Sequence, residues 1–192
     1  MKVGVLALQG AFREHIISLE SLGGISAVAV RLPEQLEGLD GLIIPGGEST
    51  AISKLMVKYG MYEAIAAAHA RGMAVWGTCA GLILIARSVV DGIEGQRSLE
   101  LMDVVARRNA FGRQVDSFET DLAFGQVGVV EAVFIRAPWI ESAGEGVEVL
   151  ATYADHIVAA RQGNLLATAF HPELTGDTAV HRYFVEQVVG AA

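Results

Sequence analysis

The sequence Met73-Ala74-Val75-Trp76-Gly77-Thr78-Cys79-Ala80-Gly81-Leu82-Ile83-Leu84-Ile85-Ala86 places the lone cysteine of the chain between two apolar runs. This pattern is typical of a buried strand that enters a tight turn and continues as a helix. Glycines on both sides of the turn allow its backbone segments to approach closely. Cys79 would lie at the apex, at a helix N-terminus whose free N–H groups favour the thiolate. The pattern alone leaves two interpretations open, a catalytic nucleophile or a small buried residue.

The flanking sequence predicts alternating strands and helices. Short apolar runs that end at glycine or proline predict strands, and apolar residues at helical spacing predict helices between them. The predicted strands cover residues 3–8, 25–32, 41–44 and 73–76, and the predicted helices cover residues 12–22, 51–59 and 61–71. This order predicts an α/β fold in three layers, with a mostly parallel central sheet and helices on both faces.

The second half of the chain has a different pattern, with more charge over residues 103–131. Alternating apolar residues predict further strands at residues 127–135, 147–152, 157–161 and 165–170, before a closing amphipathic helix at residues 179–189. We expect these strands to extend the main sheet or to pack beside it, some of them antiparallel.

Composition narrows the class of protein. With 192 residues, 52% of them hydrophobic, residues 1–192 are expected to form a single packed domain. The formal net charge of −8 argues against nucleic acid or an anionic membrane as the main partner. One cysteine excludes an internal disulfide, and no apolar run reaches the ~18 residues of a membrane-spanning helix. Without a recognisable signal peptide, a cytoplasmic location is expected.

A cysteine nucleophile needs a base within hydrogen-bonding distance and often a third group that orients this base. His171 follows the predicted strand at 165–170, at the carboxyl end where open parallel sheets place their active sites. Glu173 could hold the imidazole while the other ring nitrogen faces Cys79. The alternatives are a loop with a polar tip and a metal site, for which one histidine and one glutamate supply too few ligands. The other histidines are expected to be packing, surface or turn residues: His15, His69, His156 and His181.

The segment Pro45-Gly46-Gly47-Glu48-Ser49 also follows a predicted strand and should reach the same edge of the sheet. A glycine pair lets the main chain approach a ligand and point N–H groups at it. A helix start capped by Glu48 or Ser49 is one alternative. A phosphate-binding turn is another, although the P-loop ending and the dinucleotide spacing are absent.

Three segments in this order resemble the class I (triad) glutamine amidotransferases, namely Pro45-Gly46-Gly47, Gly77-Thr78-Cys79-Ala80-Gly81 and His171-Pro172-Glu173. The resemblance implies a flavodoxin-like α/β sandwich. Longer segments across nearly the whole chain look like the glutaminase subunits of pyridoxal 5'-phosphate synthases. These segments are Val5-Leu6-Ala7-Leu8-Gln9-Gly10-Ala11 with Glu14-His15, Pro45-Gly46-Gly47-Glu48-Ser49-Thr50, Arg108-Asn109-Ala110-Phe111-Gly112-Arg113-Gln114, Phe134-Ile135-Arg136-Ala137-Pro138 and Phe170-His171-Pro172-Glu173-Leu174.

The resemblance implies that the chain hydrolyses glutamine to glutamate and ammonia. Cys79 would attack the side-chain amide and form a thioester, His171 would take and return the proton, and Glu173 would orient His171. The backbone N–H groups of Gly47 and Ala80 would form the oxyanion hole.

The resemblance also assigns the glutamine pocket, which would consist of Gly47, Glu48, Ser49, Arg108, Ile135 and Arg136. An arginine fork suits the carboxylate of the substrate, whereas surface charge is the alternative for Arg108 and Arg136. The doubled Arg107-Arg108 leaves two candidates for one position, and alignment on the following Asn109 selects Arg108.

The implied partner is a separate synthase subunit that receives the ammonia and builds the cofactor from a pentose phosphate and a triose phosphate. Pyridoxal 5'-phosphate would be the product of that subunit, so no cofactor and no metal are expected here. Gln9 and the helix after it are candidates for the surface through which the partner gates the oxyanion loop.

Three other functions compete with this interpretation. A glutaminase subunit of another pathway, such as histidine biosynthesis, would use the same triad. A partner-independent cysteine hydrolase would need neither Arg108 nor Arg136. A non-catalytic binding module would not need the intact set of Cys79, His171 and Glu173.

Overall fold

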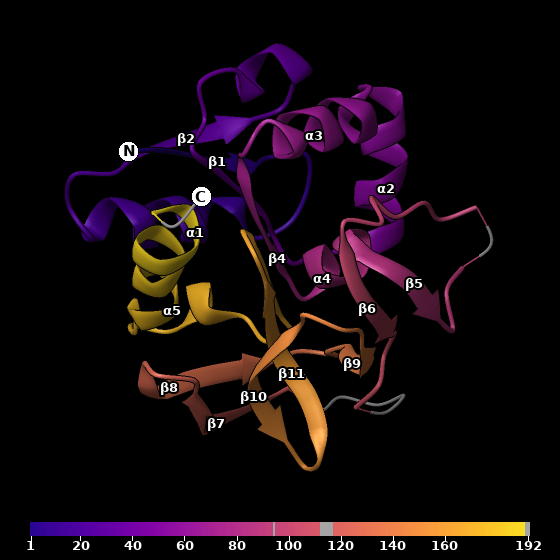
Figure 1. The fold of residues 1–192 in the computed structure, drawn as a ribbon, viewed down its shortest axis with the longest axis vertical. Coiled ribbons are helices and arrows are strands. Elements are labelled where there is room, and N and C mark those ends of the chain that lie inside the picture. Colours follow the sequence, from indigo (N-terminus) through magenta and orange to yellow (C-terminus); the bar gives the residue numbers. More distant parts are fainter. Residues whose placement is uncertain (94, 112–116, 191–192) are drawn as a thin grey trace.

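The computed structural model describes residues 1–93, 95–111 and 117–190, and Figure 1 shows their course. Within these residues, ten strands form one sheet with the order β2-β1-β3-β4-β12-β11-β9-β6-β5, and β10 pairs with β11. Neighbouring strands are parallel from β2 to β12 and mostly antiparallel beyond it.

The parallel part of the sheet carries the ends that matter for the site. It consists of β1 (Lys2–Leu6), β2 (Ser26–Val30), β3 (Gly41–Ile44), β4 (Ala74–Thr78) and β12 (Leu165–Thr168). In register, Ile44 pairs with Gly77, and Thr168 pairs with Thr78. The carboxyl ends of β3, β4 and β12 therefore lie next to one another at one edge, where the segments that follow them can meet.

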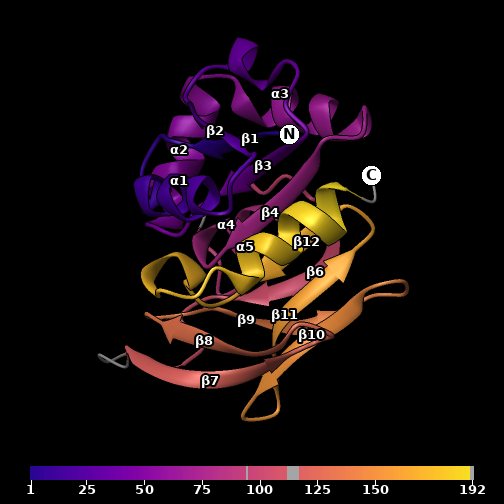
Figure 2. The same ribbon diagram turned by 90° about the vertical axis from the view of Figure 1, so that its left-hand side faces the viewer.

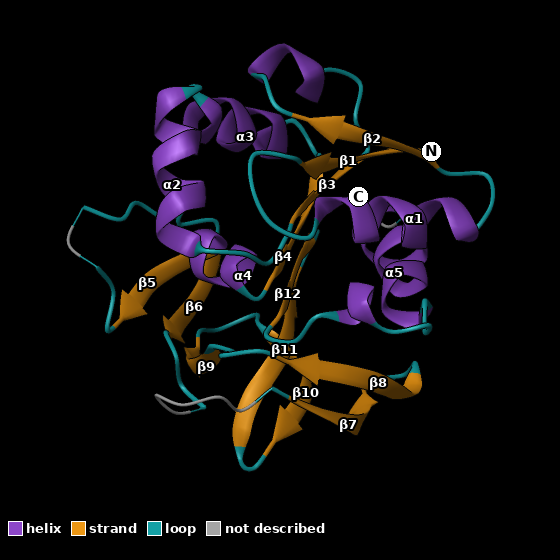
Figure 3. Ribbon diagram, turned by 180° about the vertical axis from the view of Figure 1, so that it is seen from behind, coloured by secondary structure: helices purple, strands orange, loops and turns teal. Residues whose placement is uncertain are grey.

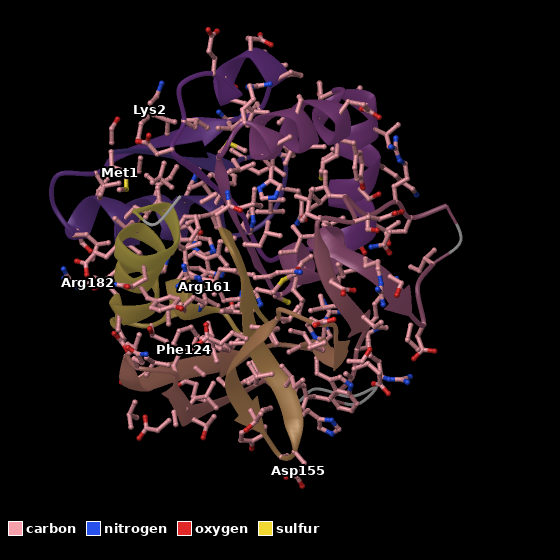
Figure 4. The ribbon with its side chains drawn as sticks, in the orientation of Figure 1. Met1, Lys2, Phe124, Asp155, Arg161 and Arg182 are labelled. Carbon is pink, nitrogen blue, oxygen red and sulfur yellow. The ribbon has the colours of Figure 1, made fainter. Side chains whose placement is uncertain are left out.

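A mostly antiparallel part continues the sheet beyond β12. It consists of β6 (Met102–Arg107), β9 (Trp139–Ala143), β10 (Glu148–Tyr153) and β11 (His156–Gln162), and β5 (Ala86–Val90) pairs with β6 in parallel at its edge. A separate antiparallel ribbon is formed by β7 (Phe118–Phe124) and β8 (Gly128–Phe134). Phe124, labelled in Figure 4, attaches this ribbon to the closing helix through its ring, whose centroid is 5.4 Å from that of Tyr183.

Helices cover both faces of the parallel strands, as Figures 2 and 3 show. On one face lie α1 (Phe12–Ser21) and α5 (Ala179–Tyr183), which continues as the π-helix Phe184–Val189. On the other face lie α2 (Ser49–Lys58), α3 (Met61–Ala70) and α4 (Ala80–Ile85). Short 3₁₀ turns occur at Pro33–Leu36 and Pro172–Leu174. The α/β fold with a mostly parallel sheet, predicted from the sequence, is thereby confirmed.

The core is continuous across these layers. Trp76 of β4 is fully buried, and its ring packs against that of Phe184 with centroids 5.3 Å apart. Apolar burial of this kind contributes about 25 cal/mol per Å² removed from water. No helix in the described part of the chain is long and apolar enough to cross a membrane.

Strands β5, β6, β7 and β9 were not predicted from the sequence. The apolar run after Cys79 predicted a helix alone, but α4 ends at Ile85 and β5 begins at Ala86. Strand β7 has one exposed face, so charged residues alternate with apolar ones and weaken the apolar signal. In the closing helix, the predicted range is confirmed, although its second half is π-helical.

Candidate active site

Cys79 occupies a sharp turn between β4 and α4. Its φ of 48° and ψ of −102° form a conformation that non-glycine residues rarely adopt. Its N–H donates to the carbonyl oxygen of Thr168 at 2.8 Å. A Cβ atom on Gly77 would overlap the backbone of Gly81, and one on Gly81 would overlap the carbonyl of Ile44. The two glycines thus permit the close approach that the strained elbow requires, as the sequence predicted.

His171 and Glu173 lie beside this elbow, after β12. His171 Nδ1 lies 2.7 Å from Glu173 Oε1, and both side chains are buried. Because a carboxylate only accepts hydrogen bonds, Nδ1 carries a proton and Nε2 is left for Cys79. Burial acts to lower the pKa of His171, but Cys79 and Glu173 outweigh it and raise this pKa to about 10. The arrangement therefore favours a protonated His171 at neutral pH.

The loop after β3 completes the cluster. The Gly46 N–H donates to Thr78 Oγ1 at 3.0 Å, which ties this loop to the end of β4. A Cβ atom on Gly46 would overlap the imidazole of His171 and would lie 3.3 Å from Cys79 Cβ. The position next to the catalytic candidates must therefore be a glycine.

A Gly46→Ala variant is expected to lower the glutamine hydrolysis that the sequence resemblance implies by about 10²-fold, because misplacing a reacting group by about 1 Å has an effect of this size. The added methyl would push the His171 ring away from Cys79, since Glu173 and the surrounding core hold the ring from behind. Steady-state ammonia release measures the effect. Gly38→Ala is not a suitable control because Gly38 has a positive φ. Gly176→Ala is suitable, because a Cβ there meets nothing. Equal activity of the two variants would contradict the prediction.

Gln9 reaches the same loop from the end of β1. Its Oε1 accepts a hydrogen bond from the Glu48 N–H at 2.9 Å, and a Cβ on Gly47 would approach this oxygen to 2.5 Å. Glu48 also caps α2, because its carboxylate accepts from the N–H groups of Thr50 and Ala51 at 3.0 and 2.7 Å. Burial acts to raise the pKa of Glu48, but these hydrogen bonds outweigh it and lower the pKa. Glu48 is thus the N-cap of α2, as one of the alternatives predicted, and it also lines the pocket described next.

A pocket opens beside Cys79, between the start of α2, the elbow and the loops after β6 and β8. It is lined by Gly47, Glu48, Ser49, Cys79, Ala80, Ile83, Arg108, Asn109, Ile135, Arg136 and Pro138. All six residues predicted for the glutamine pocket lie in this set. Ile83, Asn109 and Pro138 were not predicted. Ile83 lies four residues after Cys79, so helical spacing could have placed it on the same face.

The two neighbouring arginines have different surroundings. Arg107 forms ion pairs with Asp91 and Glu141, both at 2.8 Å, on the outside of β6. The Arg108 side chain lines the pocket, is only 11% exposed and approaches Glu48 Oε1 to 3.9 Å. The geometry therefore agrees with the choice of Arg108 and leaves Arg107 engaged elsewhere.

The remaining histidines occupy the places expected of packing and turn residues, with one addition. His69 contacts the carbonyl of Met73 at 3.0 Å, and His156 stacks on Trp139 at the start of β11. His15 and His181 are fully buried. His15 also lies against Glu173, a contact that the sequence analysis did not predict.

Residues 112–114, the end of the segment that begins at Arg108, lie outside the described residues. Among the residues that are described, no group of three or more His, Cys, Asp or Glu side chains is placed to hold a metal ion.

Comparisons with known proteins converge on one family. Residues 5–190 match the model of the SNO glutamine amidotransferase family. A curated relative from Herpetosiphon aurantiacus, pyridoxal 5'-phosphate synthase subunit PdxT, is 59% identical over 96% of this chain and 99% of its own length. The protein of the same name from Parafrankia sp. is 58% identical over 97% and 93%. A crystal structure of a glutamine amidotransferase superposes with a TM-score of 0.92 at 52% identity, covering 98% of both chains.

Proposed function

The chain belongs to the SNO glutamine amidotransferase family, and from this premise we propose that it is the glutaminase subunit of a pyridoxal 5'-phosphate synthase. It hydrolyses L-glutamine to L-glutamate and ammonia, and residues 1–192 act as one glutaminase domain. Ammonia passes to a separate synthase subunit for vitamin B6 biosynthesis. The proposal is supported above all by one observation: a strained cysteine, a buried His171–Glu173 pair and an arginine-lined pocket meet at one edge of the sheet.

The reaction begins at Cys79. Its sulfur attacks the side-chain amide carbon of glutamine, and the C=O π electrons move to oxygen. The backbone N–H groups of Gly47 and Ala80 stabilise this oxyanion. His171 donates its Nε2 proton to the amide nitrogen, so that ammonia leaves and a thioester to Cys79 remains.

The thioester is then hydrolysed. His171, now neutral at Nε2, takes a proton from a water molecule, whose oxygen attacks the thioester carbon. Collapse of the second tetrahedral intermediate breaks the C–S bond, releases glutamate and restores the thiolate beside a protonated His171. Glu173 keeps Nδ1 protonated throughout, so the correct ring nitrogen faces the reacting atoms.

The pocket supports glutamine as the substrate. Arg108, nearly buried in the wall, is suited to the α-carboxylate, because its planar fork can bond both oxygens. Glu48 and Ser49 supply oxygen acceptors for the α-ammonium group, and Ile135 gives the chain of the substrate an apolar contact. Arg136 is an exposed residue of the pocket lining and adds positive charge that attracts the carboxylate.

A partner is needed because ammonia released into neutral water is protonated and loses its nucleophilicity. Gln9 is the residue we propose for coupling to that partner. It already bonds the Glu48 N–H, next to the oxyanion donor Gly47, and it begins the segment that leads into α1. A partner that moves α1 would therefore move the oxyanion loop. No cofactor takes part in this subunit, and the cytoplasm is its proposed location.

Ammonia release from glutamine, measured for the chain alone and mixed with a pyridoxal 5'-phosphate synthase subunit, tests the function. We expect the mixture to release ammonia faster and to form pyridoxal 5'-phosphate from glutamine without added ammonium. In the same assay, Gln9→Leu should reduce the stimulation. No release from glutamine under either condition would favour a cysteine hydrolase of other specificity. Release that is indifferent to this partner would favour a partner-independent enzyme or another pathway.

A further inference from the structure

Two histidines from different helices are buried directly behind the triad. His15 belongs to α1 and His181 to α5, both are fully buried, and their ring centroids are 5.1 Å apart. Both rings also contact Trp76, with centroids 5.6 and 5.0 Å away. Apolar packing would not require imidazoles at these positions, and buried polar groups are retained at a cost unless they are hydrogen-bonded.

The contacts form a chain that ends at the triad. His15 Nδ1 lies 2.9 Å from His181 Nε2, and His15 Nε2 lies 3.4 Å from Glu173 Oε2. Oε2 is the carboxylate oxygen that His171 does not use, and among the described residues it is buried with no hydrogen-bond partner, so the contact with His15 is electrostatic. His15 Nε2 also lies 3.2 Å from Thr78 Oγ1, which accepts the hydrogen bond from the Gly46 N–H.

The protonation states of His181 and His15 follow from the hydrogen-bond acceptors beside them. Burial, the largest influence, lowers the pKa of His15 and also lowers that of His181 well below its usual value, so each ring is neutral and carries one proton. The Glu173 carboxylate can only accept, which places the His15 proton on Nε2 and makes Nδ1 an acceptor for His181 Nε2–H. The opposite tautomers would point a lone pair at the carboxylate and bury an unpaired N–H at His181.

We propose that His15 is a positioning residue of the glutaminase, which holds the second oxygen of Glu173 and is itself fixed by His181. The triad is then the reactive end of a longer series, His181–His15–Glu173–His171. Because Thr78 joins the same imidazole to Gly46, His15 also connects the orienting carboxylate to the oxyanion loop. This inference rests on the proposed function and adds a residue to it.

Substitution of His15 by glutamine or by asparagine distinguishes this role from simple packing, because the two amides differ only in their reach. The Nε2 amide of glutamine occupies nearly the place of histidine Nε2 and can reach Glu173, whereas asparagine ends near Nδ1 and cannot. We expect His15→Asn and His15→Leu to lower kcat of the complex by about 10–100-fold, the range known for the partners that orient histidine ligands at metal sites. His15→Gln should recover most of this loss, and KM should change little in all three.

A pH profile distinguishes positioning from loss of stability. The titratable groups that face Glu173 are His15 from α1 and His171 from its own loop, with Glu14 beside His15 and His181 behind it. Without the His15 donor, the ionised form of Glu173 is less favoured, so the acidic limb of kcat should move to higher pH in the Asn and Leu variants. His69→Gln, at a half-buried position of α3 that does not contact the triad, is the control and should leave the profile unchanged.

Alkylation of Cys79 by iodoacetamide provides a readout that does not depend on glutamine. Cys79 is the single cysteine of the chain, and its thiolate depends on the imidazolium that Glu173 supports. The Asn and Leu variants should react more slowly at pH 7 than wild type and the Gln variant. If wild type releases no ammonia but this order of alkylation holds, the proposed function fails and the role of His15 stands. If His15→Gln and His15→Asn had the same kcat, pH profile and alkylation rate, the role of His15 would be overturned. The comparison of these two variants is decisive even if His15→Leu does not fold.

Discussion

A Cys79→Ala variant is expected to lose glutamine hydrolysis by about 10⁴–10⁶-fold, the range found when the nucleophile of a triad is removed. The reason is chemical, because no other thiol exists in the chain and the thioester cannot form without one. The oxyanion donors and the arginine-lined pocket remain in the variant. Substrate binding should therefore persist while turnover stops, and isothermal titration with glutamine can show this separately from ammonia release.

The same variant also tests the connection to the partner. A complex made with Cys79→Ala should form no pyridoxal 5'-phosphate from glutamine but should form it when an ammonium salt is supplied. Cys79→Ser is the matched control for shape, because serine has the same number of side-chain atoms and only the sulfur is replaced by an oxygen. It should be nearly as inactive, since a hydroxyl is a far weaker acid than a thiol. Undiminished ammonia release by either variant would remove Cys79 from its proposed role.

Much of the active edge could be predicted because it is built from local signals. The strands that end there are short apolar runs, and each is followed by a segment with glycine or proline. Since the carboxyl ends of neighbouring parallel strands meet, three segments far apart in the sequence could be assigned to one site. The elbow at Cys79 required two close backbone approaches, and only glycine permits them at Gly77 and Gly81.

Other parts of the site depend on contacts that no local pattern contains. Arg107 and Arg108 are adjacent and chemically identical, and although Asn109 selected Arg108 by alignment, the physical reason lies in the acidic partners that hold Arg107 away from the pocket. His15 looked like an ordinary helix residue, because the carboxylate it contacts lies in the turn after β12. The strands of the second half were partly missed for a related reason, since their pairing partners rather than their own hydrophobicity fix them in the sheet.

A Glu173→Gln variant is expected to lower kcat by about 10³–10⁴-fold, although it preserves the size of the side chain. The new amide would donate to His171 Nδ1 rather than accept from it. The imidazole would then hold its proton on Nε2 as a neutral ring, a tautomer that cannot take a proton from Cys79. Glu173→Asp keeps the charge and shortens the side chain, so it should retain more activity than the glutamine variant. If Glu173→Gln were as active as Glu173→Asp, the orientation of His171 would not need the carboxylate.

The thermal stability of wild type and that of the Glu173→Gln variant should also respond differently to pH. Folding raises the pKa of His171 from 6.5 to about 10, against the effect of burial and because of Cys79 and Glu173. The protonated ring thus stabilises the folded chain fully below pH 6.5, and this contribution is lost as the pH rises through about 10. Without the carboxylate, the folded pKa of His171 is lower and less stability remains to be lost. The Tm of wild type should therefore fall more between pH 7 and 10 than the Tm of Glu173→Gln, as measured by thermal unfolding followed by circular dichroism. Parallel declines in the two proteins would mean that Glu173 does not hold the proton on His171.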